Sequence, residues 1–223
     1  NRFVWNMRYP DAKKVPGAVM WGGSHIGPKA VPGDYKVRMN VNGKSQTQSF
    51  KILKDPRINA TQSDFNDQFD LLMDIRNRTT EINEKILTIR SIKKQVNTLT
   101  GLMKDSGFKN DQLTDAGKAL VKSLTGIEEE LIQVKSKSGQ DPLNYPIKLD
   151  NKIAALVRVV SSVDARPTAQ SYDVLNDLVD RAEVHYKKLD KVLTDDLFKF
   201  NNMVSDVGVP AVMVIPSEMS VER

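Results

Sequence analysis

The stretch LMDIRNRTTEINEKILTIRSIKKQV, residues 72–96, decides the fold of this chain. One stripe of residues runs through it at alternating steps of 3 and 4: Leu72, Ile75, Thr79, Ile82, Ile86, Ile89, Lys93 and Val96. This spacing is typical of an amphipathic helix with a heptad-like seam. Because Thr61 and Asp64 supply an N-cap and an acidic first turn, the pattern predicts a helix over residues 61–103.

Two shorter helices are predicted after this one. Apolar residues at helical spacing predict a helix over residues 111–135, in which Gly117 and Gly126 are weak points. Residues 136–146 contain Gly139, Pro142 and Pro146 and predict a loop. The next helical pattern covers residues 147–163.

A fourth helix is predicted from Thr168 to Val207. Its stripe runs from Tyr172 to Leu193 at steps of 3 and 4 and resumes at Phe200. At about 1.5 Å per residue, the rises of the four helices nearly cancel. We therefore expect an elongated up-down-up-down four-helix bundle over residues 58–208, in a chain of the α+β class that is mostly α.

Upstream of the helices the period of the pattern changes to 2, which is typical of strands. Apolar residues alternate with polar ones over residues 1–9 and again over residues 35–41, where Asn42-Gly43 then supplies a type I′ turn. The sequence therefore predicts a strand over residues 1–9 and a β-hairpin that returns to about Leu53. The Gly and Pro residues of the segment 10–34 predict a long loop with a short extended piece at residues 18–21.

Three or four strands cannot close a β-sandwich, which takes about seven. We therefore expect residues 1–57 to form a partial β-sandwich module whose other strands lie upstream, in a longer protein. The apolar run 209–215 predicts a final strand that completes this module. The alternative for residues 209–223 is an apolar tail packed on the base of the bundle.

Composition and charge exclude several classes of protein. The 223 residues include no Cys, which excludes disulfide-stapled domains and Cys-ligated metal modules, and no apolar run approaches the ~20 residues of a membrane span. Residues 1–57 carry 11 Lys and Arg against 3 Asp, so this part of the chain could meet an acidic neighbour or a polyanion. Nucleic acid is not expected, because no recognition-helix motif is present and the helical part is net acidic.

The chemistry-bearing residues do not form a recognisable active site. The two histidines are not spaced as metal ligands, and no nucleophile elbow, phosphate loop or dinucleotide fingerprint occurs. We expect no catalytic, cofactor-binding or metal residues in this chain. Trp21 and His25, in the Gly-rich loop, are the candidates for contact with a ligand or partner, although each could instead be purely structural. Trp5 and Tyr35 alternate with polar residues and are expected in the core.

Several runs of the chain carry a resemblance to a known family: Asn1–Ala12, Trp21-Gly22-Gly23, Gly27-Pro28, Pro32–Val37, Lys54-Asp55-Pro56-Arg57 and Gln68–Leu72. They resemble the C-terminal region of large bacterial proteins with sortilin-type, BNR (Asp-box) repeat β-propellers, which are commonly labelled glycosyl hydrolases or exo-sialidase-like. In that family the propeller precedes an Ig-like or FlgD-like β module and a helical tail. The resemblance covers residues 1–100 well and the rest more loosely.

This resemblance implies an extracytoplasmic parent protein. Because no Asp-box occurs in this chain, no catalytic residue is carried over from the propeller, and the label of hydrolase belongs to the parent alone. We expect a non-catalytic accessory region that docks, spaces or oligomerises its own upstream propeller. The alternatives are a part of a carbohydrate-processing hydrolase that contributes to the active-site rim or binds glycan, and a self-associating coiled-coil scaffold.

Overall fold

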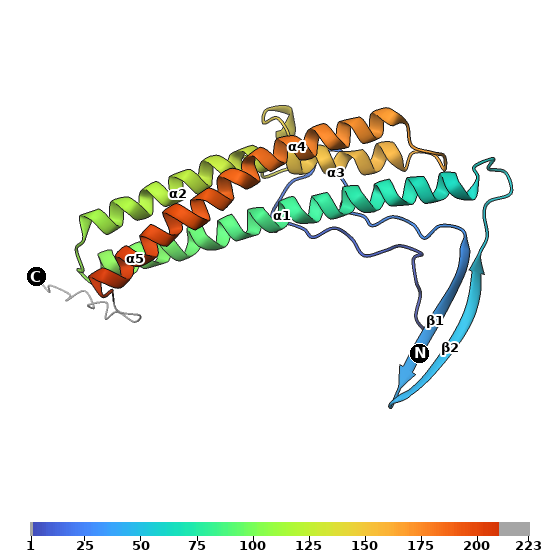
Figure 1. Cartoon of the computed structure of the whole chain (residues 1–223), viewed down its shortest axis with the longest axis horizontal. Coiled ribbons are helices and arrows are strands. Elements are labelled where there is room, and N and C mark those ends of the chain that lie inside the picture. Colours follow the sequence, from blue (N-terminus) through green and yellow to red (C-terminus); the bar gives the residue numbers. More distant parts are fainter. Residues whose placement is uncertain (1, 210–223) are drawn as a thin grey trace, which may run out of the picture. The chain divides into compact units, whose positions relative to one another are not determined.

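The computed structural model describes residues 2–209, which are mostly helical and include a two-stranded antiparallel sheet. The strands are β1 (Gly33–Val41) and β2 (Lys44–Ile52), and a short 3-10 turn spans Asp141–Leu143. The helices are α1 (Gln62–Asp105), α2 (Asp111–Leu131), α3 (Leu149–Val160), α4 (Ala169–Lys191), the π-helical segment η2 (Val192–Leu197) and α5 (Phe198–Val207) (Figure 1). The predicted mostly helical chain with a small β part is confirmed.

The chain divides into two compact units. The first unit consists of Asn1–Lys14, Met20–Glu81 and Asp150–Val179, and the second of Val15–Val19, Ile82–Leu149 and Asp180–Arg223. The residues of α1 are divided between the two units, and so are those of α4. The predicted domain boundary between residues 57 and 58 stays a prediction.

The long first helix begins and ends close to where the sequence places it. The Thr61 hydroxyl accepts the N–H of Asp64 at 3.2 Å, and the Asp64 carboxylate accepts the N–H of Thr61 at 2.9 Å, so the predicted cap is a reciprocal capping box. Seven of the eight stripe residues are buried, from Leu72 to Val96. The exception is Lys93, which keeps 21% of its side chain exposed and forms an ion pair described below.

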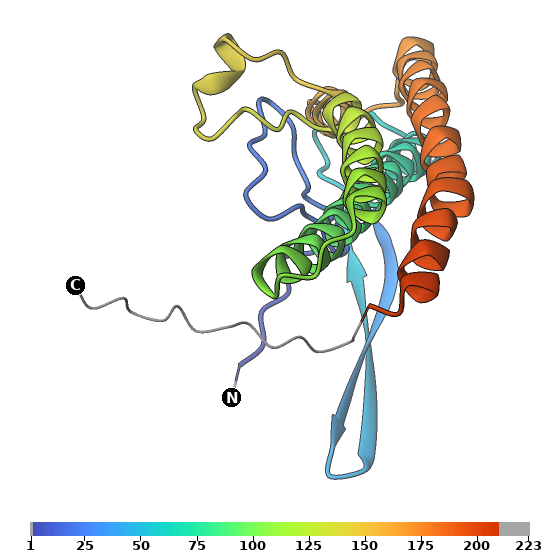
Figure 2. The same cartoon turned by 90° about the vertical axis from the view of Figure 1, so that its left-hand side faces the viewer.

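The β-hairpin also forms as predicted. Asn42 and Gly43 have φ angles of 48° and 77°, the left-handed values that a type I′ turn needs. The register pairs Val41 with Lys44 and continues to Gly33 with Ile52. Both views show the hairpin projecting away from the helices of its own unit (Figures 1 and 2). Most hairpin residues are therefore exposed on both faces of the sheet.

The predicted strand over residues 1–9 is wrong. Met7 has a φ of 57°, and the Asn6 side chain accepts the N–H of Arg8 at 3.0 Å, so a local turn interrupts the extended chain. What remains of pairing is a bridge between Arg8 and Lys29. Alternating polarity alone does not make a strand when a residue with positive φ, here Met7, interrupts the extended backbone. The predicted long loop forms, with no helix or named strand over residues 10–32.

The loop from Pro10 to Pro32 is held by backbone contacts with the N-terminal segment. The N–H of Tyr9 donates to the Pro28 carbonyl at 3.0 Å, and the N–H of Ala12 donates to the His25 carbonyl at 2.7 Å. Gly27 sits so close to this segment that an added Cβ would overlap the Tyr9 carbonyl and lie 2.6 Å from the Pro10 carbonyl oxygen. A glycine is therefore required here by space.

The second and third helices are shorter than predicted. The chain becomes extended at Ile132, which is 3% exposed and follows the fully buried Leu131. The last four residues of the predicted helix, 132–135, therefore lie outside it. After α3, the hydroxyls of Ser161 and Ser162 donate to the carbonyls of Val157 and Val159 at the end of the helix.

The fourth predicted helix is interrupted by the π-helical segment η2. Val192 and Phe200 are both buried, at 8% and 4% exposure, although eight residues separate them. In a regular α-helix that separation would place them about 80° apart, and the wider π turn brings them back onto one face. The stripe prediction is wrong at three positions: Val179 and Leu193 are half-buried, and Tyr172 is 38% exposed.

The second unit packs α2 against α5 through a small residue. A Cβ on Gly117 would lie 3.3 Å from the ring of Phe200 and 3.2 Å from Val96, so the glycine makes room for these side chains. On the same helix, Glu128 is buried and pairs with Arg90 at 2.6 Å and with Lys93 at 2.8 Å, both from α1. The predicted strand over residues 209–215 lies outside the described residues apart from Val209.

Candidate functional site

Trp21 lies in a loop whose backbone is fixed by Asn151 of α3. The Asn151 side chain accepts the N–H of Trp21 at 2.6 Å and donates to its carbonyl at 2.9 Å, and Asn151 itself is 2% exposed. Gly23 packs beside it, where a Cβ would lie 3.1 Å from the Asn151 amide nitrogen. The indole of Trp21 keeps 43% of its surface exposed, so the loop is rigidly anchored while the ring faces solvent.

His25 is half-buried in the same loop. Burial lowers the pKa of His25 and the charge of Lys14 lowers it further, while Asp11 opposes them in part. Both of the larger effects favour the neutral imidazole. Neither His25 nor Trp21 lines the grooves described below, and their role in ligand or partner contact stays a prediction.

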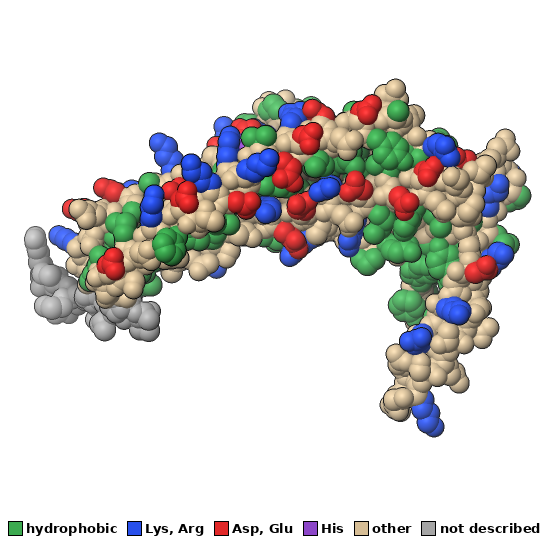
Figure 3. Space-filling view, in the orientation of Figure 1, with side chains coloured by type: hydrophobic (Ala, Val, Ile, Leu, Met, Phe, Trp, Pro, Cys, Tyr) green, Lys and Arg blue, Asp and Glu red, His purple; other side chains and the backbone are tan. Residues whose placement is uncertain are grey.

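The most prominent exposed feature of the first unit is an aromatic cluster of Trp5, Tyr35 and Phe50. Tyr35 and Phe50 are paired across the hairpin and stack with their centroids 5.8 Å apart. Trp5 packs over both rings, each at 6.2 Å, and its indole N–H donates to the Arg8 carbonyl at 3.1 Å. Trp5 and Phe50 each remain 38% exposed, so the prediction of Trp5 as a core residue is wrong. Figure 3 shows hydrophobic side chains gathered near the base of the hairpin.

This cluster forms one wall of an open groove of about 580 Å³ whose lining residues include Arg8, Lys36 and Arg38. The lining residues are Phe3, Trp5, Arg8, Tyr9, Pro10, Tyr35, Lys36, Val37, Arg38 and Phe50. The Arg8 guanidinium is held by a 2.8 Å hydrogen bond to the Gly27 carbonyl. Tyr35 donates to the Val31 carbonyl at 2.7 Å, and burial, with Tyr9 as a second cause, raises its pKa. The groove thus combines aromatic rings with positive charge.

Sequence analysis could have found part of this groove. A two-residue turn at Asn42-Gly43 sets Tyr35 opposite Phe50, but the polar Gln46 and Gln48 obscured the register of the return strand. The position of Trp5 carried no such signal, because it depends on the turn at Met7.

A second, smaller pocket in the same unit has a volume of about 260 Å³. Its walls include Ile26, Leu53, Phe65 and Phe69. Its buried polar side chain, Gln68, donates to the carbonyls of Val160 and, at 2.5 Å, Val163. These bonds occupy the N–H groups of the Gln68 amide, and charged residues such as Lys54 and Asp55 also line the pocket.

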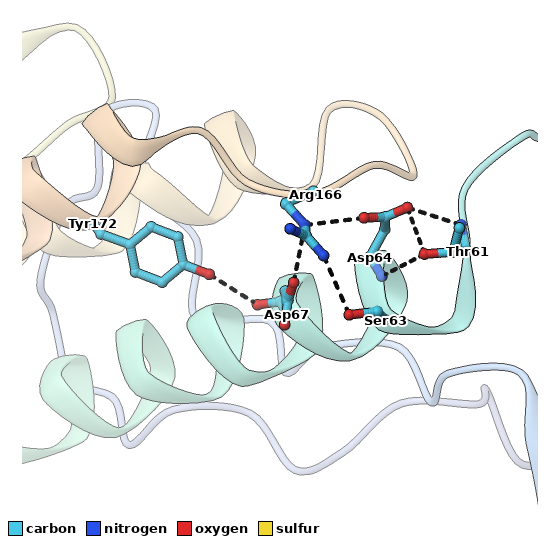
Figure 4. A network of polar contacts seen from close by, with 6 residues as sticks. All are labelled: Thr61, Ser63, Asp64, Asp67, Arg166 and Tyr172. Carbon is cyan, nitrogen blue, oxygen red and sulfur yellow. Dashed lines mark hydrogen bonds and ion pairs between the residues drawn. The ribbon is translucent and has the colours of Figure 1, made fainter.

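A polar network secures the start of α1 (Figure 4). Arg166 reaches Asp64 at 3.0 Å and Asp67 at 3.1 Å, and it donates to the Ser63 hydroxyl at 3.2 Å. The Tyr172 hydroxyl donates to the Asp67 carbonyl at 3.4 Å, which accounts for the exposure of Tyr172. Hydrogen bonds from Thr61 lower the pKa of Asp64, and Arg166 lowers it further. These contacts tie the segment before α4 to the first turn of α1 and serve the fold.

Metal-ligand groups and membrane-spanning helices are both absent from residues 2–209. Within that range no three His, Cys, Asp or Glu side chains are grouped so that they could hold a metal ion. None of the helices described there combines the length and the apolar character that crossing a membrane requires.

Comparison of the chain with protein-family models, with curated proteins and with solved structures finds no match.

Proposed function

We propose that this chain is a non-catalytic C-terminal accessory region of a larger extracytoplasmic protein, and that it docks or spaces an upstream β-propeller. The family and the location rest on the resemblance of residues 1–100. In this proposal, residues 1–57 are part of an Ig-like or FlgD-like β module, and residues 58–208 are a four-helix bundle that acts as a spacer.

The observation that carries the proposal is the uncovered apolar face of the hairpin. Val37, Met39 and Val41 share one face of β1 and are 50%, 57% and 53% exposed. An isolated two-stranded hairpin is at best marginally stable in water, and sheets normally bury their apolar face against another layer. A hairpin with this face open supports a role in docking against a further β layer.

Hydrogen exchange tests the docking. The amides of β1 and β2 should exchange slowly in a longer protein that carries the upstream propeller and quickly in this chain, and dye binding to the Val37 face should be lost in the longer protein. Equal exchange and equal dye binding in the two proteins would contradict the proposal. In a separate assay, this chain should hydrolyse no aryl glycoside, and turnover that Trp21→Ala or His25→Ala abolished would also contradict it.

Glycan binding is the second candidate function, as part of a carbohydrate-processing hydrolase. The aromatic groove favours it, because rings such as Trp5 can stack on sugars and the cation of Arg8 suits acidic glycans. A panel of neutral and acidic glycans, at low and moderate salt, tests it with Trp5→Ala and Trp21→Ala side by side. Binding lost in Trp5→Ala alone would assign the groove, and binding lost in Trp21→Ala alone would assign the loop. No binding to the panel would remove this candidate.

A further inference from the structure

The hairpin is amphipathic, and its two strands differ in the side chains that they present on each face. On one face, β1 presents Tyr35, Val37, Met39 and Val41, while β2 presents Lys44, Gln46, Gln48 and Phe50. On the other face, β1 presents Lys36 and Arg38 between Asp34 and Asn40, and β2 presents Ser, Thr and Lys51. The run of alternating apolar and cationic side chains is therefore a property of β1.

The outer edge of β1 has no neighbouring strand among residues 2–209. The two-residue turn makes Val41 and Lys44 a hydrogen-bonded pair, and such pairs alternate along an antiparallel ladder. The N–H and C=O groups of Lys36, Arg38 and Asn40 consequently point away from β2. They form a template on which another extended segment can add.

The charges along this edge restrict what can add to it. A second copy of β1, placed antiparallel about Val37, would set Lys36 opposite Arg38 twice, and directly opposed like charges destabilise a sheet. The edge of β2 from another copy would set Gln46 and Gln48 beside the apolar residues of β1. A segment that places acidic residues opposite Lys36 and Arg38 would pair with these cations. If apolar residues alternate with the acidic ones, the same segment also extends the apolar face that contains Val37.

We infer that the outer edge of β1 accepts, by strand addition, an extended segment in which apolar residues alternate with Asp or Glu. This inference rests on the proposed docking function, and it states the kind of segment that the hairpin would bind. The added strand hydrogen-bonds to the backbone of Lys36, Arg38 and Asn40, extends the apolar face beside Val37 and Met39, and pairs its carboxylates with the two cations.

Peptide binding to the full chain tests the inference. The probes are three blocked eight-residue peptides: one alternates Val and Glu, one alternates Val and Lys, and one contains four Val followed by four Glu. The alternating Val and Glu peptide should bind at least about tenfold more tightly at low salt than either of the others. It should also slow amide exchange at Lys36, Arg38 and Asn40. Equal affinity for the three peptides overturns the inference.

Two variants, each with a matched control, separate strand addition at the edge from general charge. Asn40→Pro removes an outward N–H without changing charge or the ladder to β2, so it should abolish peptide binding while Asn40→Ala retains it. Lys36→Glu with Arg38→Glu should reverse the preference toward the Val and Lys peptide, whereas the matched pair Lys44→Glu with Lys51→Glu on β2 should not. Binding that survives Asn40→Pro overturns strand addition.

The outcome also distinguishes this inference from the docking function. If the peptide fails to bind but a longer protein still protects the Val37 face, docking stands and strand addition at β1 is wrong. If neither occurs, both fail.

Discussion

Glu128 is the residue whose charge the second unit depends on most. Burial raises the pKa of this carboxyl, but hydrogen bonds and charges from Lys93 and Arg90 outweigh it, so the pKa lies below its usual value. Glu128→Gln leaves two cations without their counter-charge and should lower the free energy of unfolding by about 1–3 kcal/mol. Urea unfolding at pH 7 measures this loss, with the exposed neighbour Glu129→Gln as the control.

The same carboxylate gives the stability a pH dependence. A group whose pKa is depressed by folding contributes stability that is complete above its unfolded pKa of about 4.3 and is lost as the pH falls through the lower folded pKa. The stability difference between the wild-type chain and Glu128→Gln should therefore be constant from pH 7 to about pH 5 and shrink below about pH 4. A difference that grew on acidification would contradict the assigned ion pair.

Gly27 and Gly22 are glycines for different reasons: Gly27 because there is no space for a Cβ, and Gly22 because its φ is positive. An Ala at residue 27 would collide with the Tyr9 carbonyl, so Gly27→Ala should cost more than about 2 kcal/mol and release the loop from the N-terminal segment. Gly22 has a φ of 69° with open space around it, so Gly22→Ala should cost only about 1 kcal/mol of backbone strain. Thermal unfolding ranks the two variants, and equal melting temperatures would contradict this account.

At the scale of elements, α2 contains two glycines, Gly117 and Gly126, that differ in how much space surrounds them. Gly126 has nothing within 4 Å of an added Cβ, so Gly126→Ala should stabilise the chain by up to about 1 kcal/mol through helix propensity. At Gly117 the Cβ would press on Thr100, Val96 and Phe200, and the repacking should cancel or reverse that gain. Chemical denaturation of both variants checks the contrast, which would fail if Gly117→Ala stabilised as much as Gly126→Ala.

The elements also show how far sequence reasoning reaches. Strictly local signals located α1 within two residues at each end, and Asn42-Gly43 located the hairpin turn. Sequence-based predictions failed where tertiary contacts decide: the turn at Met7 removed a strand, and the π-helical segment broke the regular spacing of buried residues between Val192 and Phe200. In the groove, the pairing of Tyr35 with Phe50 can be predicted from the two-residue turn. The position of Trp5 beside these rings cannot be predicted from it.

At the scale of the whole molecule, net charge opposes self-association of the chain, whereas exposed apolar surface favours it. The net charge is +5, with 11 Lys and Arg against 3 Asp in residues 1–57, so copies repel each other through the same region that exposes Val37 and Met39. Salt screens this repulsion and leaves the apolar attraction, so the chain should be monomeric at low salt and associate as salt rises. Sedimentation velocity at several salt concentrations measures it.

The control for this association is Val37→Thr with Met39→Thr, which should remain monomeric at every salt concentration. Association that this variant does not weaken would place the contact elsewhere, as in the coiled-coil scaffold considered from the sequence. A dimer that salt dissociates would show that charge attracts the copies.

The anchored loop and the aromatic cluster have a spectroscopic consequence. Both tryptophans of the chain, Trp5 and Trp21, belong to the same compact unit. Selective excitation of indole therefore gives an emission signal from that unit, whereas the far-ultraviolet circular dichroism is dominated by helices shared between the two units. Melting curves from the two signals coincide only if the units unfold in one cooperative step, so the natural fluorophores already label the molecule for a test of its cooperativity.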